Sequence, residues 1–201
     1  MRRRALMGTI STPINKNYLT IEPLEDSFTV YLSGSYCYYR IDYGEWIKLE
    51  TGTNTPSINV GQTIQFKRDD YVKSLGTFST TGGFNLSGNC MSMLYGDKAA
   101  DYNSVGYQSF LGLFRNSKVR SVDSKFLPAT TLANYCYSSM FRFCGKLRYI
   151  KAMFTTTPSV SYTYDWVWGV SSTGTFVKNK NATWNVVGNN GIPNGWTVKT
   201  E

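Results

Sequence analysis

The sequence contains no histidine and is poor in charged residues, which make up 17% of its 201 residues. Histidine is the commonest general base in enzymes and the commonest metal ligand, so its absence removes both. A Ser-His-Asp triad or a Cys-His pair is therefore impossible. None of the 13 Asp and Glu residues stands in a pattern that marks a catalytic carboxylate. We expect no enzymatic activity and no cofactor.

The cysteines also lack the spacing of a metal site. There are four of them and no C-x-x-C pair, and without histidine a zinc site is not expected. In one shared helix Cys136 and Cys144 would lie about 12 Å apart, whereas a disulfide needs Cα atoms within about 7 Å. We expect free thiols buried in the core, and no metal.

Long apolar runs are missing as well. No segment reaches the roughly eighteen apolar residues of a membrane span. Residues 1–8 have the basic start of a secretion signal, but the apolar run after it ends within a few residues, whereas a signal needs about 7–15. We expect neither a membrane span nor a secretion signal.

What the chain has in abundance is small polar side chains and tyrosine. It contains 20 Ser, 22 Thr, 15 Asn and 15 Tyr. Such a composition favours extended strands and recognition through hydroxyl and amide groups. The hydrophobic share of 41% is enough for a packed core.

Residues 1–17 are predicted to form an extended basic arm. They contain Pro13, no acid and little apolar material, so they cannot build a core of their own. We expect the arm to order on a partner and to act in assembly. Its basic residues are Arg2, Arg3, Arg4 and Lys16.

Residues 18–87 alternate between apolar and polar residues with a period of two. The alternation is clear over residues 28–33, 37–42 and 64–67, and turn signals such as Asp42-Tyr43-Gly44 lie between these runs. This pattern predicts short antiparallel strands arranged as a β-sandwich.

Residues 88–201 contain an internal repeat. Residues 118–122 match 146–150 with an offset of 28, and residues 110–115 match 137–142 with an offset of 27. The upstream block has helical spacing and the downstream block reads as a strand, so the unit falls in the leucine-rich-repeat range. We expect a short α/β solenoid, with residues 155–201 as a β-rich cap. Expected buried residues are Phe110, Leu113, Phe114, Val119 and Val122, and their counterparts Tyr137, Met140, Phe141, Leu147 and Ile150.

The stretches "LPATTLANYCYSSMFRFCGKL", "WGVSSTGTFVKN" and "GIPNGWTV" resemble BspA-like leucine-rich-repeat surface proteins of gut Bacteroidota and their crAss-like phages. The likeness covers roughly residues 88–201. It implies binding or adhesion without catalysis, and it does not specify a ligand.

Basic residues recur once per repeat and would stack at strand spacing, about 5 Å, in a solenoid. Three aligned columns of cations predict contact with an anionic surface; the alternative is a solvated basic face with no partner. The columns pair Arg115 with Arg142, Lys118 with Lys146 and Arg120 with Arg148.

Four tryptophans lie near the C-terminus, and two roles are open for them. They could stack on sugar rings, or they could fill the core of a small cap. The residues are Trp166, Trp168, Trp184 and Trp196.

Two functions compete. The first is a phage virion structural protein, such as a head fibre, capsid decoration or tail-fibre component. It would hold other virion proteins through the basic arm, sit on the virion surface and form a homo-oligomer, with a trimer as the expected order. The alternative is a bacterial cell-surface adhesin or glycan-binding module, for which a host-surface or mucus glycan is the candidate ligand. The missing secretion signal favours the first. Nucleic acid is not expected as a partner, because the basicity is local.

Overall fold

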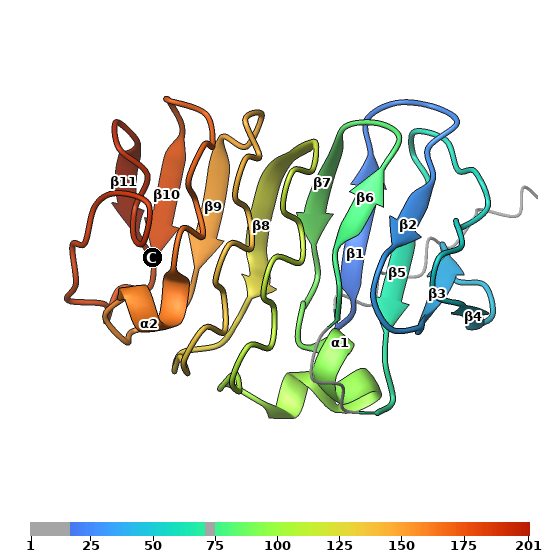
Figure 1. Ribbon diagram of the computed structural model, residues 1–201, viewed down its shortest axis with the longest axis horizontal. Coiled ribbons are helices and arrows are strands. Elements are labelled where there is room, and N and C mark those ends of the chain that lie inside the picture. Colours follow the sequence, from blue (N-terminus) through green and yellow to red (C-terminus); the bar gives the residue numbers. More distant parts are fainter. Residues whose placement is uncertain (1–16, 71–74) are drawn as a thin grey trace, which may run out of the picture.

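The computed structural model describes residues 17–70 and 75–201. Within them, nine strands form one mixed sheet in the order β11-β10-β9-β8-β7-β1-β5-β3-β4 (Figure 1). The strands are β1 (Leu19–Pro23), β3 (Cys37–Ile41), β4 (Ile47–Leu49), β5 (Ile64–Lys67), β7 (Phe84–Ser87), β8 (Val119–Leu127), β9 (Tyr149–Ala152), β10 (Thr175–Lys178) and β11 (Thr197–Thr200). The predicted assembly residues Arg2, Arg3, Arg4 and Lys16 lie outside the described residues.

The sheet has an antiparallel half and a parallel half. β7 pairs antiparallel with β1 and parallel with β8, and the ladder from β7 to β11 is parallel throughout. The parallel half is a β-solenoid of about three turns. The 28-residue offset seen in the sequence is the register of β8 on β9, in which Ser121 pairs with Tyr149 and Val122 with Ile150.

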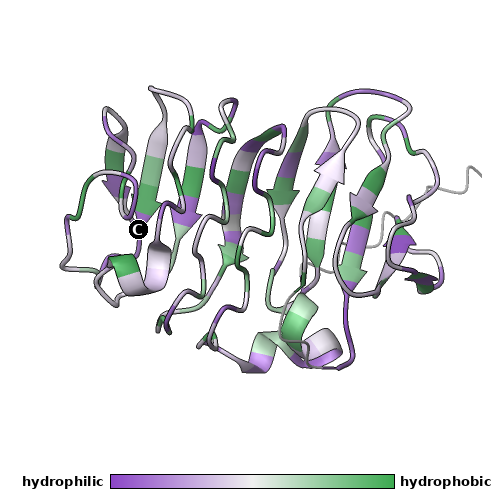
Figure 2. Cartoon of the chain, in the orientation of Figure 1, coloured by the Kyte–Doolittle hydropathy of each residue, from purple (hydrophilic) through white to green (hydrophobic). Residues whose placement is uncertain are grey.

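A second layer covers the inner face of the sheet (Figure 1). Over the antiparallel half it contains a two-stranded sheet of β2 (Val30–Leu32) and β6 (Phe78–Thr80). The ring of Phe78 packs against Phe66 of β5, with 4.9 Å between centroids. One apolar core runs through both halves of the molecule. Figure 2 shows hydrophobic residues on strands of both halves. The sheet therefore continues across residue 87, and the division into a sandwich domain and a repeat domain stays a prediction.

Over the parallel half, the second layer is not helical as the spacing predicted. Residues 108–117 and 135–144 each form a chain of consecutive turns, which we call a turn ribbon. Alternate backbone N–H groups donate to the carbonyl three residues earlier, as Met140 does to Tyr137 (3.1 Å). The intervening N–H groups donate to the next coil, as Phe141 does to Trp166 (2.8 Å). The ribbon thus satisfies its own backbone and also joins neighbouring coils, which a helix cannot do.

The ribbon repeats every four residues, which explains the wrong helix prediction. One residue in each four has a positive φ: Gln108, Gly112 and Asn116 in one coil, and Tyr135, Ser139 and Phe143 in the next. Two residues in each four point into the core; the two between them are exposed at Arg115 and Asn116, whereas at Ser138 and Ser139 they are small and buried. Apolar residues at i, i+3 and i+4, such as Phe110, Leu113 and Phe114, fit this pattern as well as they fit a helix. The described α-helices are short: α1 (Ser92–Tyr95) and α2 (Val160–Thr163), with a 3-10 helix η1 (Gly96–Asp101).

All ten residues predicted to be buried in the repeats have no exposed surface, so that prediction is confirmed. Equivalent rings stack from coil to coil. The centroids of Phe110 and Tyr137 are 5.8 Å apart, and those of Phe114 and Phe141 are 6.1 Å apart. These stacks form the axis of the solenoid core.

The four cysteines are free and buried, as predicted. They are Cys37, Cys90, Cys136 and Cys144. Burial raises the pKa of the Cys37 and Cys136 thiols to about 12 and that of Cys144 to about 11. Raised pKa values favour the protonated thiol near neutral pH, and all four side chains lie in the core.

None of the helices in the described part of the chain has the length and apolar content that crossing a bilayer requires.

Candidate functional site: a basic pocket and an aromatic turn face

A polar pocket of about 360 Å³ lies where β6 meets the end of the first turn ribbon. Two contacts hold β6 there: the Phe78 amide donates to the Leu113 carbonyl (2.7 Å), and the Thr77 hydroxyl donates to the Gly112 carbonyl (3.1 Å). We call it the basic pocket. Its lining residues are Thr77, Ser79, Thr80, Arg115, Asn116, Ser117 and Lys118.

The charge of the basic pocket comes from Arg115 and Lys118, which are both exposed. The Lys118 ammonium donates to the Thr81 carbonyl at 2.7 Å, which holds it at the rim. Within residues 17–70 and 75–201, neither cation has a carboxylate within ion-pair distance. The pocket therefore offers uncompensated positive charge beside hydroxyl and amide groups, an arrangement suited to an anionic ligand that also carries hydroxyls.

The structure places the six predicted column residues in different surroundings. The Arg148 amide donates to the Arg120 carbonyl at 2.9 Å, so these two are neighbours on adjacent coils, and both side chains are exposed as predicted. The Arg148 guanidinium donates to the Thr173 hydroxyl (2.9 Å). Lys146 is exposed outside the pocket lining.

Arg142 differs from the other five, because its side chain lies against aromatic rings and pairs with an acid. Its guanidinium carbon lies 4.2 Å from the ring centroid of Trp168 and 4.9 Å from that of Phe143. It also forms an ion pair of 3.8 Å with Asp165. Arg142 thus belongs to an aromatic cluster and not to a free cationic column.

Of the two roles left open for the four tryptophans, core filling applies to three, which corrects the sugar-stacking alternative for them. Trp166, Trp184 and Trp196 are at most 6% exposed, and each indole N–H donates to a backbone carbonyl. Buried rings of this kind have no face left for a ligand. Trp168 is 39% exposed and keeps a free surface.

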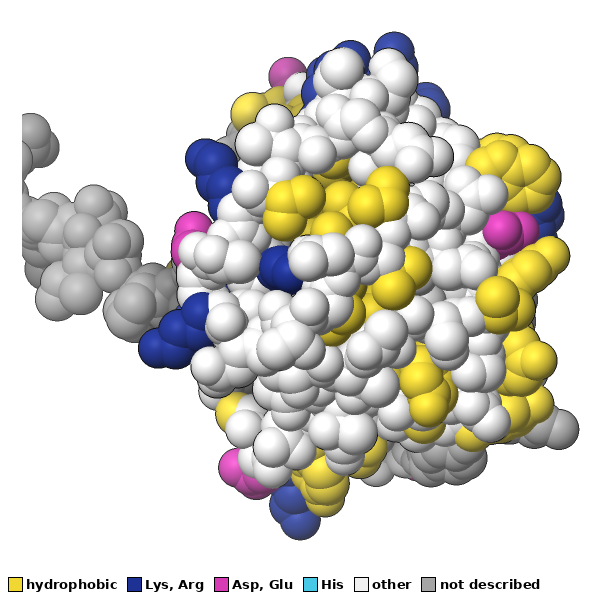
Figure 3. All heavy atoms as spheres, turned by 90° about the vertical axis from the view of Figure 1, so that its left-hand side faces the viewer, with side chains coloured by type: hydrophobic (Ala, Val, Ile, Leu, Met, Phe, Trp, Pro, Cys, Tyr) yellow, Lys and Arg dark blue, Asp and Glu magenta, His cyan; other side chains and the backbone are white. Residues whose placement is uncertain are grey.

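An exposed apolar surface on the two turn ribbons, on residue 107 before the first of them and on the equivalent turns at residues 164–169 of the next coil was missed by the sequence argument. Its members occupy outward positions of the four-residue repeat, and four of them lie in two contacting pairs, Tyr107 with Tyr135 and Phe143 with Trp168. The four-residue series that begins at Tyr107 continues with Leu111 and Arg115, so no regular aromatic spacing marked this surface in the sequence. We call this surface the aromatic turn face: Tyr107, Leu111, Tyr135, Phe143, Tyr164 and Trp168, each 39–53% exposed. Figure 3 shows hydrophobic side chains in a line along the right-hand edge of the C-terminal end, the side of the ribbon layer.

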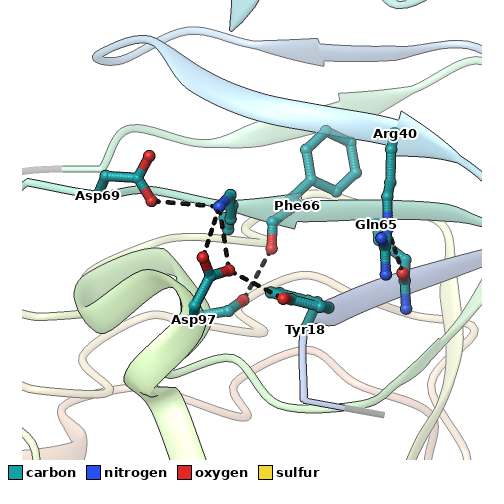
Figure 4. A network of polar contacts seen from close by, with 8 residues as sticks. Tyr18, Arg40, Gln65, Phe66, Asp69 and Asp97 are labelled. Atoms are coloured by element: carbon teal, nitrogen blue, oxygen red, sulfur yellow. Dashed lines mark hydrogen bonds and ion pairs between the residues drawn. The ribbon is translucent and has the colours of Figure 1, made fainter. Parts of the chain in front are cut away.

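A separate polar network joins β1, β5 and η1 (Figure 4). The Lys67 side chain is 9% exposed, and its ammonium lies 3.0 Å from both carboxylate oxygens of Asp97 and 3.4 Å from Asp69. The Tyr18 hydroxyl donates to the same Asp97 carboxylate at 2.8 Å. The network anchors the start of β1, directly after the predicted arm, so we assign it a structural role.

This network makes acid stability depend on Asp97. The hydrogen bond from Lys67 holds the pKa of Asp97 below its ordinary value. A carboxyl whose pKa is lower in the folded state stabilises the fold above the unfolded pKa, and that contribution is lost as the pH falls through the folded value. We expect Asp97→Asn to flatten the dependence of the unfolding free energy on pH below about 4, measured by urea titration. Asp101→Asn, an exposed acid in the same 3-10 helix, is the control and should leave the wild-type slope. An unchanged slope in Asp97→Asn would refute the assignment.

No group of three or more carboxylate or thiol side chains placed to hold a metal ion occurs in the described part of the chain. No protein-family model, curated protein or solved structure matches this chain. The geometry therefore carries the functional argument, and its features are the basic pocket and the aromatic turn face.

Proposed function

We propose that this protein is a non-enzymatic interaction protein that binds an anionic partner on the ribbon side of its β-solenoid. The observation that carries the proposal is the basic pocket, where Arg115 and Lys118 converge with hydroxyl groups and pair with no described acid. The solenoid suits this role because lateral backbone hydrogen bonds hold the pocket in a rigid frame. The rigid frame lowers the ordering cost of binding.

The biological setting that we propose is the virion surface of a phage, with the protein as a structural component such as a head fibre, capsid decoration or tail fibre. The sequence resemblance and the basic arm support this setting. The alternative is a bacterial cell-surface adhesin, which the same resemblance also supports. Both settings require a surface that contacts a partner, and they differ in what the arm does.

Charge reversal tests the binding proposal. We expect Arg115→Glu combined with Lys118→Glu to weaken binding to immobilised polyglutamate at least about tenfold at low salt. Each exposed charge contact contributes up to about 1 kcal/mol, and charge reversal replaces two attractions by two repulsions. Salt should weaken wild-type binding in the same assay. Lys98→Glu with Lys180→Glu is the control, since it makes the same change in net charge at exposed sites outside the pocket. If both double variants lose the same binding affinity, the effect comes from net charge alone and the pocket is not the binding site.

Removal of the arm tests the virion setting. We expect a protein without residues 2–17 to unfold at the wild-type temperature, because this segment has little apolar material to contribute to a core. The same protein should no longer join particles, since ordering an arm on a partner is its proposed role. Occupancy is measured by quantitative mass spectrometry of purified particles. Wild-type occupancy of the truncated protein would show that the arm is not an anchor and would remove the local support that the arm gives to the virion setting.

A further inference from the structure

We infer that the basic pocket and the aromatic turn face form one continuous site for an acidic polysaccharide that lies across the coils of the solenoid. This inference rests on the proposed function and names its ligand class. Both features belong to the same turn ribbons, because Arg115 lines the pocket while Leu111 of the same ribbon belongs to the aromatic turn face.

Backbone register aligns the key side chains. The Asn116 amide donates to the Arg142 carbonyl (2.9 Å), and the Phe143 amide donates to the Trp168 carbonyl (2.7 Å). Arg115, Arg142 and Trp168 therefore occupy equivalent positions in three successive coils, with Phe143 beside the last two. We call these four residues the cation–aromatic row. It runs from the basic pocket toward the C-terminal end.

The spacing of the row suits a sugar chain. Neighbouring coils in a parallel ladder are about 5 Å apart, which is close to the length of one pyranose residue in an extended polysaccharide. A chain laid across the coils would therefore meet one outward side chain per sugar. Phe143 and Trp168, with centroids 5.1 Å apart and rings tilted by 46°, offer apolar surface to the C–H face of a pyranose.

The charges around the row select an acidic ligand. Arg115, Lys118 and Lys146 are exposed and unpaired among the described acids. Asp165 is the acid that pairs with a residue of the cation–aromatic row, Arg142. Its side chain is largely buried, so it neutralises little of the exposed positive charge. A second copy of this chain would bring another basic rim against this one, which opposes self-association here. Carboxylates along a polysaccharide complement the rim.

The polar lining favours a sugar over an acidic peptide. The Ser79 hydroxyl and the Asn116 amide can each donate and accept, so they match sugar hydroxyls in either sense. The Thr80 hydroxyl donates to the Gly82 carbonyl at 2.9 Å and can still accept a hydrogen bond from a sugar. An acidic side chain offers acceptors only. Exposed aromatic patches on a monomer also mark binding surfaces, and this one adjoins the hydroxyl-lined cavity.

The test is calorimetric titration of the full chain with a galacturonic acid tetrasaccharide. Cellotetraose is the control for sugar without charge, because it is a neutral chain of equal length. Hexaglutamate is the control for negative charge without sugar. We expect the acidic tetrasaccharide to bind at least tenfold more tightly than cellotetraose. Phe143→Ala with Trp168→Ala should weaken it at least tenfold and leave hexaglutamate binding unchanged. Tyr43→Ala is the control, since Tyr43 is 47% exposed in the turn between β3 and β4, at the opposite end of the sheet.

The outcomes separate this inference from the proposed function. If the protein binds hexaglutamate but not the acidic tetrasaccharide, the sugar site is overturned and the anionic pocket stands. If it binds neither ligand, both the sugar site and the proposed function are overturned. Equal binding of the two tetrasaccharides, or no effect of the aromatic double variant, would also overturn the inference. If the double variant does not fold, the Trp168 indole N–H resonance of the wild type, assigned with Trp168→Phe, decides. It should shift with the acidic tetrasaccharide and not with hexaglutamate; no shift would overturn the site.

Discussion

Replacing Phe141 by alanine is expected to lower the free energy of unfolding by about 3–5 kcal/mol, as truncation of a large buried aromatic does. Phe141 has no exposed surface, and its ring lies 6.1 Å from Phe114 and 6.2 Å from Trp166, which belong to the coils on either side. The cavity would therefore open at the axis of the solenoid, where backbone hydrogen bonds on both sides limit relaxation. Urea unfolding followed by circular dichroism measures the loss.

Phe143→Ala is the matched control for this variant. Phe143 lies two residues further along the same ribbon but points outward and is 43% exposed. Its truncation removes less buried surface, so we expect a loss below about 2 kcal/mol. If Phe141→Ala costs less than about 1 kcal/mol, or no more than Phe143→Ala, the inward and outward phases of the ribbon have been assigned wrongly.

Gly88→Ala should be nearly as damaging, for a reason that lies in the backbone. Gly88 follows β7 with φ +77°, and an added Cβ would overlap the carbonyl oxygen of Tyr18. That oxygen accepts hydrogen bonds from the Asn89 amide (3.1 Å) and the Thr20 hydroxyl (2.9 Å), so it cannot move away without breaking the junction of β1 and β7. Overpacking costs typically 1–3 kcal/mol and the left-handed conformation about 1–2 kcal/mol more for an alanine.

Gly52→Ala separates these two contributions. Gly52 has nearly the same φ, +80°, but its Cβ would meet nothing within 4 Å. We expect the backbone penalty alone, about 1–2 kcal/mol, measured by the same urea titration. A Gly88→Ala loss equal to that of Gly52→Ala would show that the β1–β7 junction yields, and that the antiparallel half is less tightly joined to the solenoid than its hydrogen bonds indicate.

The sequence by itself determined the register of the solenoid and the composition of its core. The match of residues 118–122 with 146–150 is the pairing of β8 with β9, and every residue predicted to be buried in the two repeats is buried. The reason is that the positions of apolar residues define both the strand alternation and the repeat offset. Apolar side chains become buried whether the segments between the strands are helices or turns. The period-two segments likewise became β2, β3 and β5.

Only the tertiary structure decided whether the blocks between the strands are helices or turn ribbons. Apolar residues at i, i+3 and i+4 satisfy both, so the pattern in Phe110, Leu113 and Phe114 is ambiguous. The choice depends on where alternate backbone N–H groups find acceptors, and here those acceptors lie one coil away. The outward positions of a turn ribbon also differ from those of a helix, which is why the aromatic turn face could not be predicted from the sequence.

The candidate site shows the same limit. Composition and repeat spacing indicated cations and exposed aromatics, but they could not show that Trp166 is wholly buried while Trp168, two residues on, is exposed. They could not show that β6, more than thirty residues upstream of Arg115, completes the pocket beside it. Which side chains share a surface depends on contacts between segments distant in the chain, and a local pattern holds no information about them.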